Sequence, residues 1–244
     1  MKWKDPLILV ALIAVAWELA YLAVGDVALR SPASTAKSLV AMLGDARFVP
    51  HVRETALAFA QGFAIAVLVG LLIGVPLGAA RFAGEVAEPI LVALYSIPKV
   101  TLYPVILLIF GIGMPAKVAF GAIHGIVPIS IFAMNAVRNI NPTHLRTARA
   151  LRLSPLQTAR SVLFPAALPE IVTGIRVGFS LALIGTLLGE MFGSQHGLGH
   201  LLMQAMSLHN IERILALTLL LVVFAAGVNA LLLALDRRVH RSAA

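Results

Sequence analysis

Long apolar runs alternate with short polar segments along the whole chain. A helix that crosses a bilayer needs roughly 20 mostly apolar residues, and six runs reach that length. Their approximate bounds are residues 6–24, 55–80, 88–110, 115–137, 168–190 and 214–235. The pattern therefore predicts an all-α membrane protein with a single transmembrane domain over residues 1–244, which leaves no room for a separate soluble domain.

The composition supports a membrane protein. Hydrophobic residues make up 60% of the 244 residues and charged residues only 12%, against about 25% charged residues in a typical soluble domain. So little charge argues against a soluble enzyme, a disordered chain or a nucleic-acid-binding module. The chain has no cysteine, which excludes disulfides, thiolate catalysis and cysteine-based metal sites.

The basic residues that give the net charge of +8 lie mostly between the apolar runs, where they bear on orientation. With six spans, both ends of the chain lie on one side. That side holds the larger set of cations: Lys2, Lys4, Arg81, Arg138, Arg146, Arg149, Arg152, Arg160, Arg237, Arg238 and Arg241. The other side holds Arg30, Lys37, Arg47, Arg53, Lys117 and Arg213. We therefore expect both termini and residues 138–164 to be cytoplasmic. A cleaved signal peptide is the alternative for the N-terminus, although Glu18 interrupts its apolar run.

Glycine and proline predict how the spans associate and bend. Small residues four apart lie on one helix face and allow another helix to approach closely, which predicts helix packing at Gly70, Gly74, Gly78, Gly121 and Gly125. Prolines within or near the membrane each remove a backbone donor; they are Pro76, Pro98, Pro104 and Pro128. The freed carbonyls need protein or water partners, so we expect spans that move or line a path.

A second kind of helix is predicted after Asn141, between the fourth and fifth spans. Asn141 is a good N-cap and Pro142 suits the first helical position, so a short helix is expected to run to about Leu153. Ser154 and Pro155 repeat the same start signal. Basic and apolar side chains form adjacent stripes on the first helix: Arg146, Arg149 and Arg152 in one, Leu145, Ala148 and Leu151 in the other. Such a helix needs a protein groove or an anionic lipid surface.

Few residues suggest chemistry inside the membrane. Lys99 lies in the third span near Tyr95, Ser96, Thr101 and Tyr103. A cation among hydroxyl groups favours passage of an anion, but Lys99 is equally expected to pair with a buried acid or a backbone carbonyl. His124 is a further candidate for this path, with hydrogen-bonded packing as its alternative. His196 and His200 lie among glycines that favour a loop, so no metal site is expected. No P-loop sequence occurs, so we expect this chain to bind no ATP and to be no enzyme.

Several short stretches occur in a fixed order along the chain. They are Trp17-Glu18, Arg30-Ser31-Pro32, Ile97-Pro98-Lys99, Phe110-Gly111-Ile112-Gly113, residues 164–169 (FPAALP), Gly174-Ile175-Arg176, Gly189-Glu190-Met191 and Gly197-Leu198-Gly199. Together they resemble the inner-membrane permease subunits of binding-protein-dependent ABC importers, in the nitrate, sulfonate and taurine branch. The resemblance implies the type I ABC importer transmembrane fold.

In this family the short cytoplasmic helix is the coupling helix, which docks in a cleft of a separate ATPase subunit. The resemblance implies that the coupling residues here are His144, Leu145, Arg146, Ala148, Arg149, Leu151, Arg152 and Leu153, although only Ala148 matches a named residue of the family motif. The Glu and Gly of the family motif fall on Arg146 and Arg152. We therefore expect an acidic partner groove, and we expect Arg152 to lack glycine's freedom to turn with positive φ. The resemblance also implies a structural pair or gate contact for Arg176 and Glu190, and it adds Glu190 to the candidate path.

The resemblance further implies the partners. They are a pair of ATPase subunits that carry ATP and Mg²⁺, a second permease subunit, an extracytoplasmic binding protein and the bilayer of the bacterial inner membrane; no nucleic acid is expected. The second permease is expected to be another copy of this chain in a homodimer, with a sister subunit as the alternative. Residues 25–51, with an amphipathic helix at 36–42, and residues 193–210 are expected on the outer side, where the binding protein docks. The transported solute is expected to be small and anionic. The alternatives are an ATP-independent transporter or channel and a non-transporting membrane assembly subunit.

Overall fold

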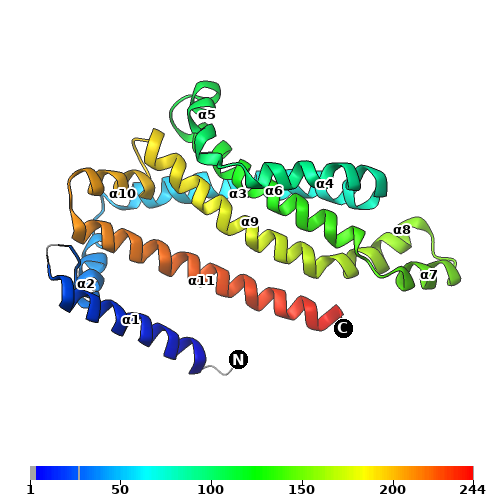
Figure 1. Ribbon diagram of the computed structural model, residues 1–244, viewed down its shortest axis with the longest axis horizontal. Helices are drawn as coiled ribbons and strands as arrows, with labels where there is room; N and C mark the ends of the chain where they lie inside the picture. Colours follow the sequence, from blue (N-terminus) through cyan, green and yellow to red (C-terminus); the bar gives the residue numbers. More distant parts are fainter. Residues whose placement is uncertain (1–3, 27, 244) are drawn as a thin grey trace.

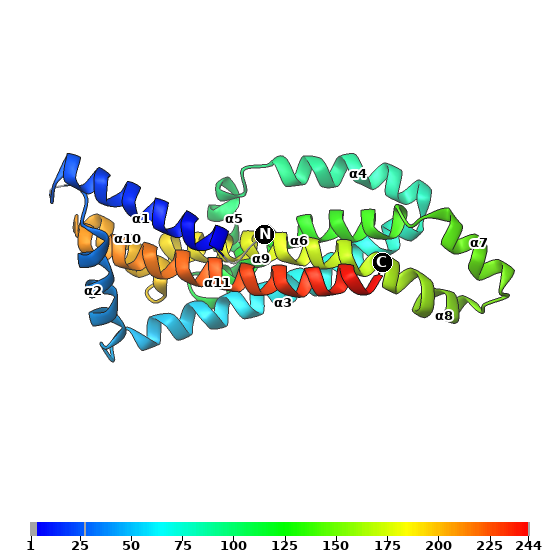
Figure 2. The same cartoon turned by 90° about the horizontal axis from the view of Figure 1, so that it is seen from below.

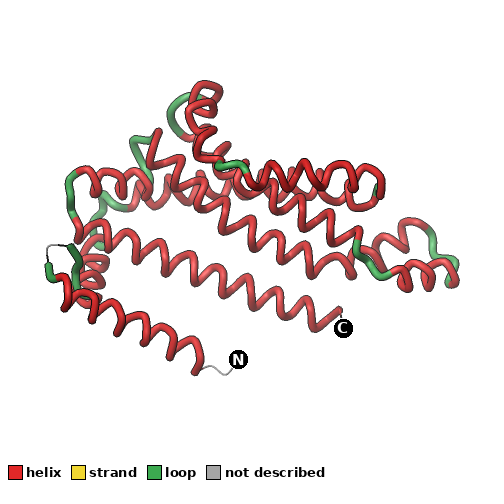
Figure 3. Tube along the Cα trace, in the orientation of Figure 1, coloured by secondary structure: helices red, strands yellow, loops and turns green. Residues whose placement is uncertain are grey.

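The computed structural model describes residues 4–26 and 28–243, with side chains over 8–26 and 28–234. The described chain is helical throughout, without strands (Figure 3), as the sequence predicts. In order, its elements are α1 (Lys4–Val24), α2 (Pro32–Leu43), α3 (Val49–Ala79), α4 (Arg81–Ser96), the 3-10 turn η1 (Lys99–Leu102), α5 (Tyr103–Phe110), α6 (Met114–Arg138), α7 (Pro142–Ala150), α8 (Pro155–Thr158), the π-helical turn η2 (Ala159–Leu163), α9 (Phe164–Gly193), α10 (Leu198–Ser207) and α11 (Ile211–Ala243).

Helices α3, α6 and α9 lie side by side in the centre of the molecule (Figures 1 and 2). The five glycines expected at helix contacts all face a neighbouring helix: Gly70, Gly74 and Gly78 of α3 face α6, Gly121 of α6 faces α9, and Gly125 of α6 lies against both α3 and α9. A Cβ on Gly74 would lie 2.4 Å from the Ser130 carbonyl oxygen, and one on Gly121 would lie 2.5 Å from Thr186 Oγ1. The backbones are therefore closer than any side chain at these positions allows.

The third expected span, residues 88–110, is not one straight helix. Helix α4 ends at Ser96, and the η1–α5 segment (Lys99–Phe110) turns away from it by 82° (Figure 2). Pro98 explains the break, because the residue before a proline is driven out of the helical region. Ile97 accordingly has an extended backbone, with φ −64° and ψ 130°. The bend agrees with the one expected from the proline, and it divides residues 88–110 between two helical segments, α4 and η1–α5.

Among the described residues, four helices are long and apolar enough to cross a membrane: Val49–Ala79, Met114–Arg138, Pro155–Gly193 and Ile211–Ala234. The bent pair of α4 and η1–α5 makes a fifth if it is counted as one span. The first expected span coincides with α1, whose described apolar part, Ile8–Val24, is shorter than these four. Helix α2 contains the expected amphipathic helix and begins earlier, at Pro32, because Ser31 caps it by accepting a hydrogen bond from the Ser34 N–H.

Described members of the two sets of cations lie at opposite ends of the bundle. Helices α7 and α8 project from one end, whereas α2, α10 and the start of α11 form the other (Figures 1 and 2). Arg81 and Arg138 line a common cavity with Leu145 of α7, and Arg47 and Arg213 share one at the α2–α10 end. Lys2 lies outside the described residues, as do the side chains of Lys4, Arg237, Arg238 and Arg241.

Candidate functional site

The segment between α6 and α9 contains the two short helices that the sequence predicts, with the predicted caps. The Asn141 side chain accepts a hydrogen bond from the Thr143 N–H at 2.9 Å, which caps α7. Ser154 and Gln157 form a reciprocal capping box at α8. From there the chain passes through the π-helical turn η2 into α9. The first turn of each helix is thus stabilised by hydrogen bonds to side chains two or three residues away.

Helix α7 ends at Ala150, earlier than the expected Leu153, in a Schellman motif. The Arg152 N–H donates to the Arg149 carbonyl at 3.0 Å, and the Leu153 N–H donates to the Ala148 carbonyl at 3.1 Å. This motif requires a left-handed residue at position 152, and Arg152 has φ +52°. The expectation that an arginine cannot make this turn is therefore wrong. Arg152 takes the conformation that favours glycine and bears its steric cost.

The faces of α7 differ in exposure as the stripes predict. Ala148 is buried and Leu145 is half-buried, whereas Arg146, Arg149 and Arg152 are exposed. Leu151 is 66% exposed, although it lies in the apolar stripe. A cavity of about 340 Å³ separates α7 from η2 and the start of α9; it is lined by His144, Thr147, Ala148, Leu151, Leu153, Ser161, Val162, Pro165 and Ala166. The end of the molecule therefore presents arginines beside an uncovered apolar patch.

Four of the expected path residues gather where the third span breaks. Lys99 Nζ donates a hydrogen bond to the Tyr95 carbonyl at 3.2 Å and lies 5.3 Å from the centre of the Tyr95 ring. The hydroxyl groups of Ser96 and Thr101 bond to carbonyls of Val92 and Pro98. Of the two partners expected for Lys99, the structure thus shows the backbone carbonyl. The bend places one half-buried cation and three exposed hydroxyl-bearing side chains, those of Tyr95, Ser96 and Thr101, at the surface of the subunit.

The other three path candidates lie inside the helix packing. The Tyr103 hydroxyl donates to the Gly189 carbonyl at 2.7 Å, and His124 Nδ1 lies 2.8 Å from the Phe120 carbonyl oxygen. Glu190 is fully buried and accepts hydrogen bonds from Thr55 and from the Gly199 N–H. The structure therefore does not bring these three together with Lys99 on one open surface, and their role in a path stays a prediction.

Arg176 and Glu190 do not form a pair. Both lie on α9, and 14 residues of helix separate them by about 21 Å along the axis at roughly 1.5 Å a residue. The structural contacts of Glu190 are with α3 and α10 instead. A direct contact between Arg176 and Glu190 is therefore excluded, and each residue has its own role.

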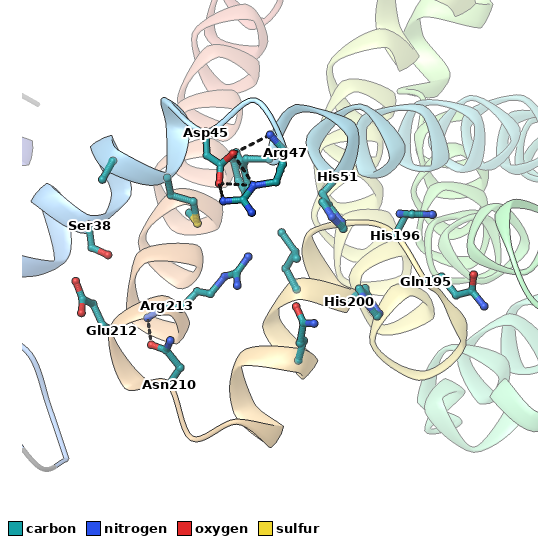
Figure 4. Close-up of a pocket in the computed structure, with 15 residues that line it drawn as sticks. Ser38, Asp45, Arg47, His51, Gln195, His196, His200, Asn210, Glu212 and Arg213 are labelled. Carbon is teal, nitrogen blue, oxygen red and sulfur yellow. Dashed lines mark hydrogen bonds and ion pairs between the residues drawn. The ribbon is translucent and has the colours of Figure 1, made fainter.

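A cavity of about 630 Å³ opens at the other end of the molecule, between α2, α10 and the start of α11 (Figure 4). It is lined by Ser38, Ala41, Met42, Asp45, Arg47, Phe48, His51, Gln195, His196, His200, Leu201, Gln204, Asn210, Glu212 and Arg213. Arg47 bonds to Asp45 at 3.0 Å and holds the pKa of that carboxyl below its ordinary value. We refer to this space as the α2–α10 cavity.

His51 joins the two histidines that the sequence singled out. Its ring centre lies 5.6 Å from that of His196 and 6.3 Å from that of His200. Within the described part of the chain, no group of three or more His, Asp or Glu side chains has a geometry that could hold a metal ion. Sequence reasoning missed His51 because it lies on α3, far along the chain from His196 in the α9–α10 connection and from His200 on α10.

Lys117 is a second contact that the sequence did not reveal. It was expected among the outer cations, but its side chain is only 1% exposed and its Nζ lies 2.8 Å from Glu54 Oε1. Its second partner is the His196 carbonyl, at 3.1 Å. This pair ties the start of α6 to α3 and to the α9–α10 connection.

The fold and the site together define a multi-pass α-helical membrane protein that carries a short cationic helix beyond the end of its bundle. The chain belongs to the family described as binding-protein-dependent transport system inner membrane component, whose model matches residues 66–241. It is therefore an ABC importer permease of the inner membrane, as the sequence resemblance implies.

Individual relatives agree with this assignment. The chain is 33% identical over 172 residues to a probable ABC transporter permease protein of Haemophilus influenzae, with 70% of each chain covered. It is 25% identical over 253 residues to the taurine transport system permease protein TauC of Escherichia coli, which covers 98% of this chain and 92% of that one. A solved structure of the MetNI methionine ABC transporter in an inward-facing conformation matches with a TM-score of 0.64 at 22% identity, over 82% of this chain and 99% of that chain. The fold is thus that of a type I ABC importer permease.

Proposed function

We propose that this chain works as one of two identical permease subunits that import a small anionic solute, driven by separate ATPase subunits that carry ATP and Mg²⁺. The observation that carries the proposal is α7, whose exposed arginines and uncovered leucine project beyond the bundle. Relatives named for aliphatic sulfonates, taurine and nitrate support a solute with a negatively charged sulfonate or oxyanion group.

The proposed sidedness places α7 and both termini in the cytoplasm. The positive-inside rule supports it, because arginines cluster at the α7 end of the bundle. Helices α1 and α11 both point their free ends toward that same side (Figure 1). The α2–α10 end then faces the extracytoplasmic binding protein that delivers the solute.

Docking of α7 on the ATPase is proposed to rest on charge and on apolar contact. Arg146 and Arg149 are exposed and Leu151 is 66% exposed, so an acidic groove with an apolar floor fits this surface. The double variant Arg146→Glu/Arg149→Glu should lose most co-purification with the ATPase. The control is Arg53→Glu, a charge reversal at an exposed arginine on α3 at the other end of the bundle, which should leave the complex intact. Equal loss in both variants would contradict the docking role, and so would a basic groove on the ATPase.

The solute path is proposed to run past the bend between α4 and η1, at the face that meets the second copy. Lys99 is the cation on this surface, and it is held by the Tyr95 carbonyl rather than by an acid. Its ammonium group is therefore available to an anion. We expect Lys99→Ala to lower uptake of taurine or nitrate without loss of assembly, and Lys99→Arg to retain uptake because the charge is kept. Equal loss of assembly in Lys99→Ala would assign Lys99 a structural role.

The decisive test uses the complete complex in vesicles, with its binding protein and with ATP supplied on the ATPase side. Uptake should be sensitive to vanadate and should require the ATPase subunits. Uptake at the full rate without any ATPase would identify an ATP-independent transporter instead. A complex that assembles but moves none of the sulfonates or oxyanions offered would point to a non-transporting assembly subunit.

A further inference from the structure

The connection between α9 and α10 is held by side chains from three long helices. Four consecutive residues, His196 to Gly199, each use one backbone group for such a bond. The His196 carbonyl accepts from Lys117 of α6 at 3.1 Å, the Gly197 N–H donates to His51 of α3 at 3.1 Å, the Leu198 N–H donates to Thr55 of α3 at 2.8 Å, and the Gly199 N–H donates to Glu190 of α9 at 2.9 Å. Helix α10 is thus anchored at its first residues.

Glu190 supplies the cap that α10 lacks locally. The first N–H groups of a helix have no partner within the helix, and Gly197 at the N-cap position offers no side chain. The Glu190 carboxylate accepts the Gly199 N–H directly. It also lies 2.8–2.9 Å from Thr55 Oγ1, and the oxygen of that hydroxyl accepts the Leu198 N–H. Both partners of the Glu190 carboxylate, the Thr55 hydroxyl and the Gly199 N–H, donate to it, which suits an acidic side chain at a helix N-terminus.

Two glycines make this contact possible. Gly197 has φ +119°, and a Cβ there would lie 2.2 Å from Glu190 Cδ. A Cβ on Gly199 would lie 2.4 Å from the Leu187 carbonyl oxygen. The carboxylate therefore reaches the start of α10 only because neither position bears a side chain. The sequence stretches Gly189-Glu190-Met191 and Gly197-Leu198-Gly199 are two halves of one structural unit.

We propose that Glu190 is a positioning residue that caps α10 from α9 and holds this helix against α3. Helix α10 contributes His200, Leu201 and Gln204 to the α2–α10 cavity, so the cap sets one wall of that cavity. The proposal gives Glu190 a role other than lining the solute path. The extracytoplasmic location of this wall, where the binding protein would dock, rests on the proposed function. The capping of α10 by Glu190 is independent of the proposed function.

The absence of native cysteine allows a direct test with single-cysteine reporters. Ala205 of α10 is 1% exposed and Ala133 of α6 is fully buried, and cysteine is only slightly larger than alanine. In purified complex, maleimide should label neither Ala205→Cys nor Ala133→Cys at an appreciable rate. Adding Glu190→Ala should raise labelling of Ala205→Cys about fivefold or more, as expected for the loss of a helix cap, and leave Ala133→Cys protected.

Thr55 provides a matched pair that does not alter Glu190 itself. Thr55→Val removes the hydroxyl at nearly constant shape and should increase labelling of Ala205→Cys. Thr55→Ser keeps the hydroxyl and should retain the protection. Because these substitutions remove no charge, they keep the test valid even if Glu190→Ala fails to fold.

Continued protection of Ala205→Cys in both Glu190→Ala and Thr55→Val would overturn the proposal. A parallel rise at Ala133→Cys would also overturn it, because Glu190 would then be a general packing residue. The labelling needs neither ATP nor solute. Failure of ATP-driven uptake would therefore refute the proposed function and leave the capping of α10 by Glu190 unaffected. Failure of the labelling test would refute the capping role and leave the proposed function unaffected.

Discussion

Replacing Arg152 by glycine should stabilise the end of α7. Arg152 lies at the left-handed position of a Schellman motif, with φ +52°. That conformation costs a non-glycine residue about 1–2 kcal/mol. Glycine avoids this cost, but its greater conformational freedom in the open state offsets about 0.5–1 kcal/mol of the gain. The net gain is about 1 kcal/mol, or roughly a fivefold smaller population of the locally opened state. Arg152 is exposed, so loss of its side chain removes little packing.

Hydrogen exchange of the purified complex measures this effect directly. The amides of Arg152 and Leu153 donate the two hydrogen bonds of the motif, and their exchange should slow about fivefold in Arg152→Gly. Arg152→Ala removes the guanidinium but keeps the steric cost, so its exchange should stay near that of the parent chain. Arg149→Gly places glycine inside α7 and should speed exchange, because glycine in a helix costs about 1 kcal/mol relative to alanine.

Two results would refute this reasoning. Slowing in Arg152→Ala equal to that in Arg152→Gly would show that repulsion within the arginine stripe, and not the backbone, strains the turn. Unchanged exchange in Arg152→Gly would show that the left-handed conformation at residue 152 does not strain the end of α7.

Three further perturbations follow from the packing. Gly74→Ala should destabilise the α3–α6 contact by about 1–3 kcal/mol, measured as a lower melting temperature. Gly227→Ala, where an added Cβ meets nothing within 4 Å, should not lower the melting temperature, because alanine also favours the helix. Glu54→Gln should lower thermal stability more than Lys117→Met does, by about 3 kcal/mol, because Glu54→Gln leaves the more deeply buried charge, that of Lys117, without its acid. A larger loss of stability in Lys117→Met would contradict the burial of Lys117. Asn141→Ala should cost about 1 kcal/mol at the start of α7, measured as faster amide exchange in its first turn.

Local signals predict the segments of this fold well. The cap at Asn141 and the second start at Ser154 act through bonds to residues two or three positions away, so a sequence contains both partners. The glycines of α3 and α6 likewise identify close-contact faces. The helix end at Ala150 was less predictable, because an arginine in the left-handed region carries no sequence signal for a turn.

Contacts between distant residues could not be predicted in this way. Lys117 belongs to the outer cations by its position in the chain, and only the packed bundle shows it buried against Glu54. Glu190 is 135 residues from Thr55, its hydrogen-bond partner. A periodic pattern shows which face of a helix is apolar, but it does not show which helix covers that face.

The sequence by itself determined that this is a multi-pass helical membrane protein with a short cationic helix between spans, because hydropathy, capping and charge bias act within a few turns of helix. The tertiary structure alone decided how far the third span bends at Pro98, by 82°, and that a buried carboxylate of α9 caps α10. The physical reason is that a buried polar group must find a partner wherever the packed helices place one, and that place depends on the arrangement of the whole bundle.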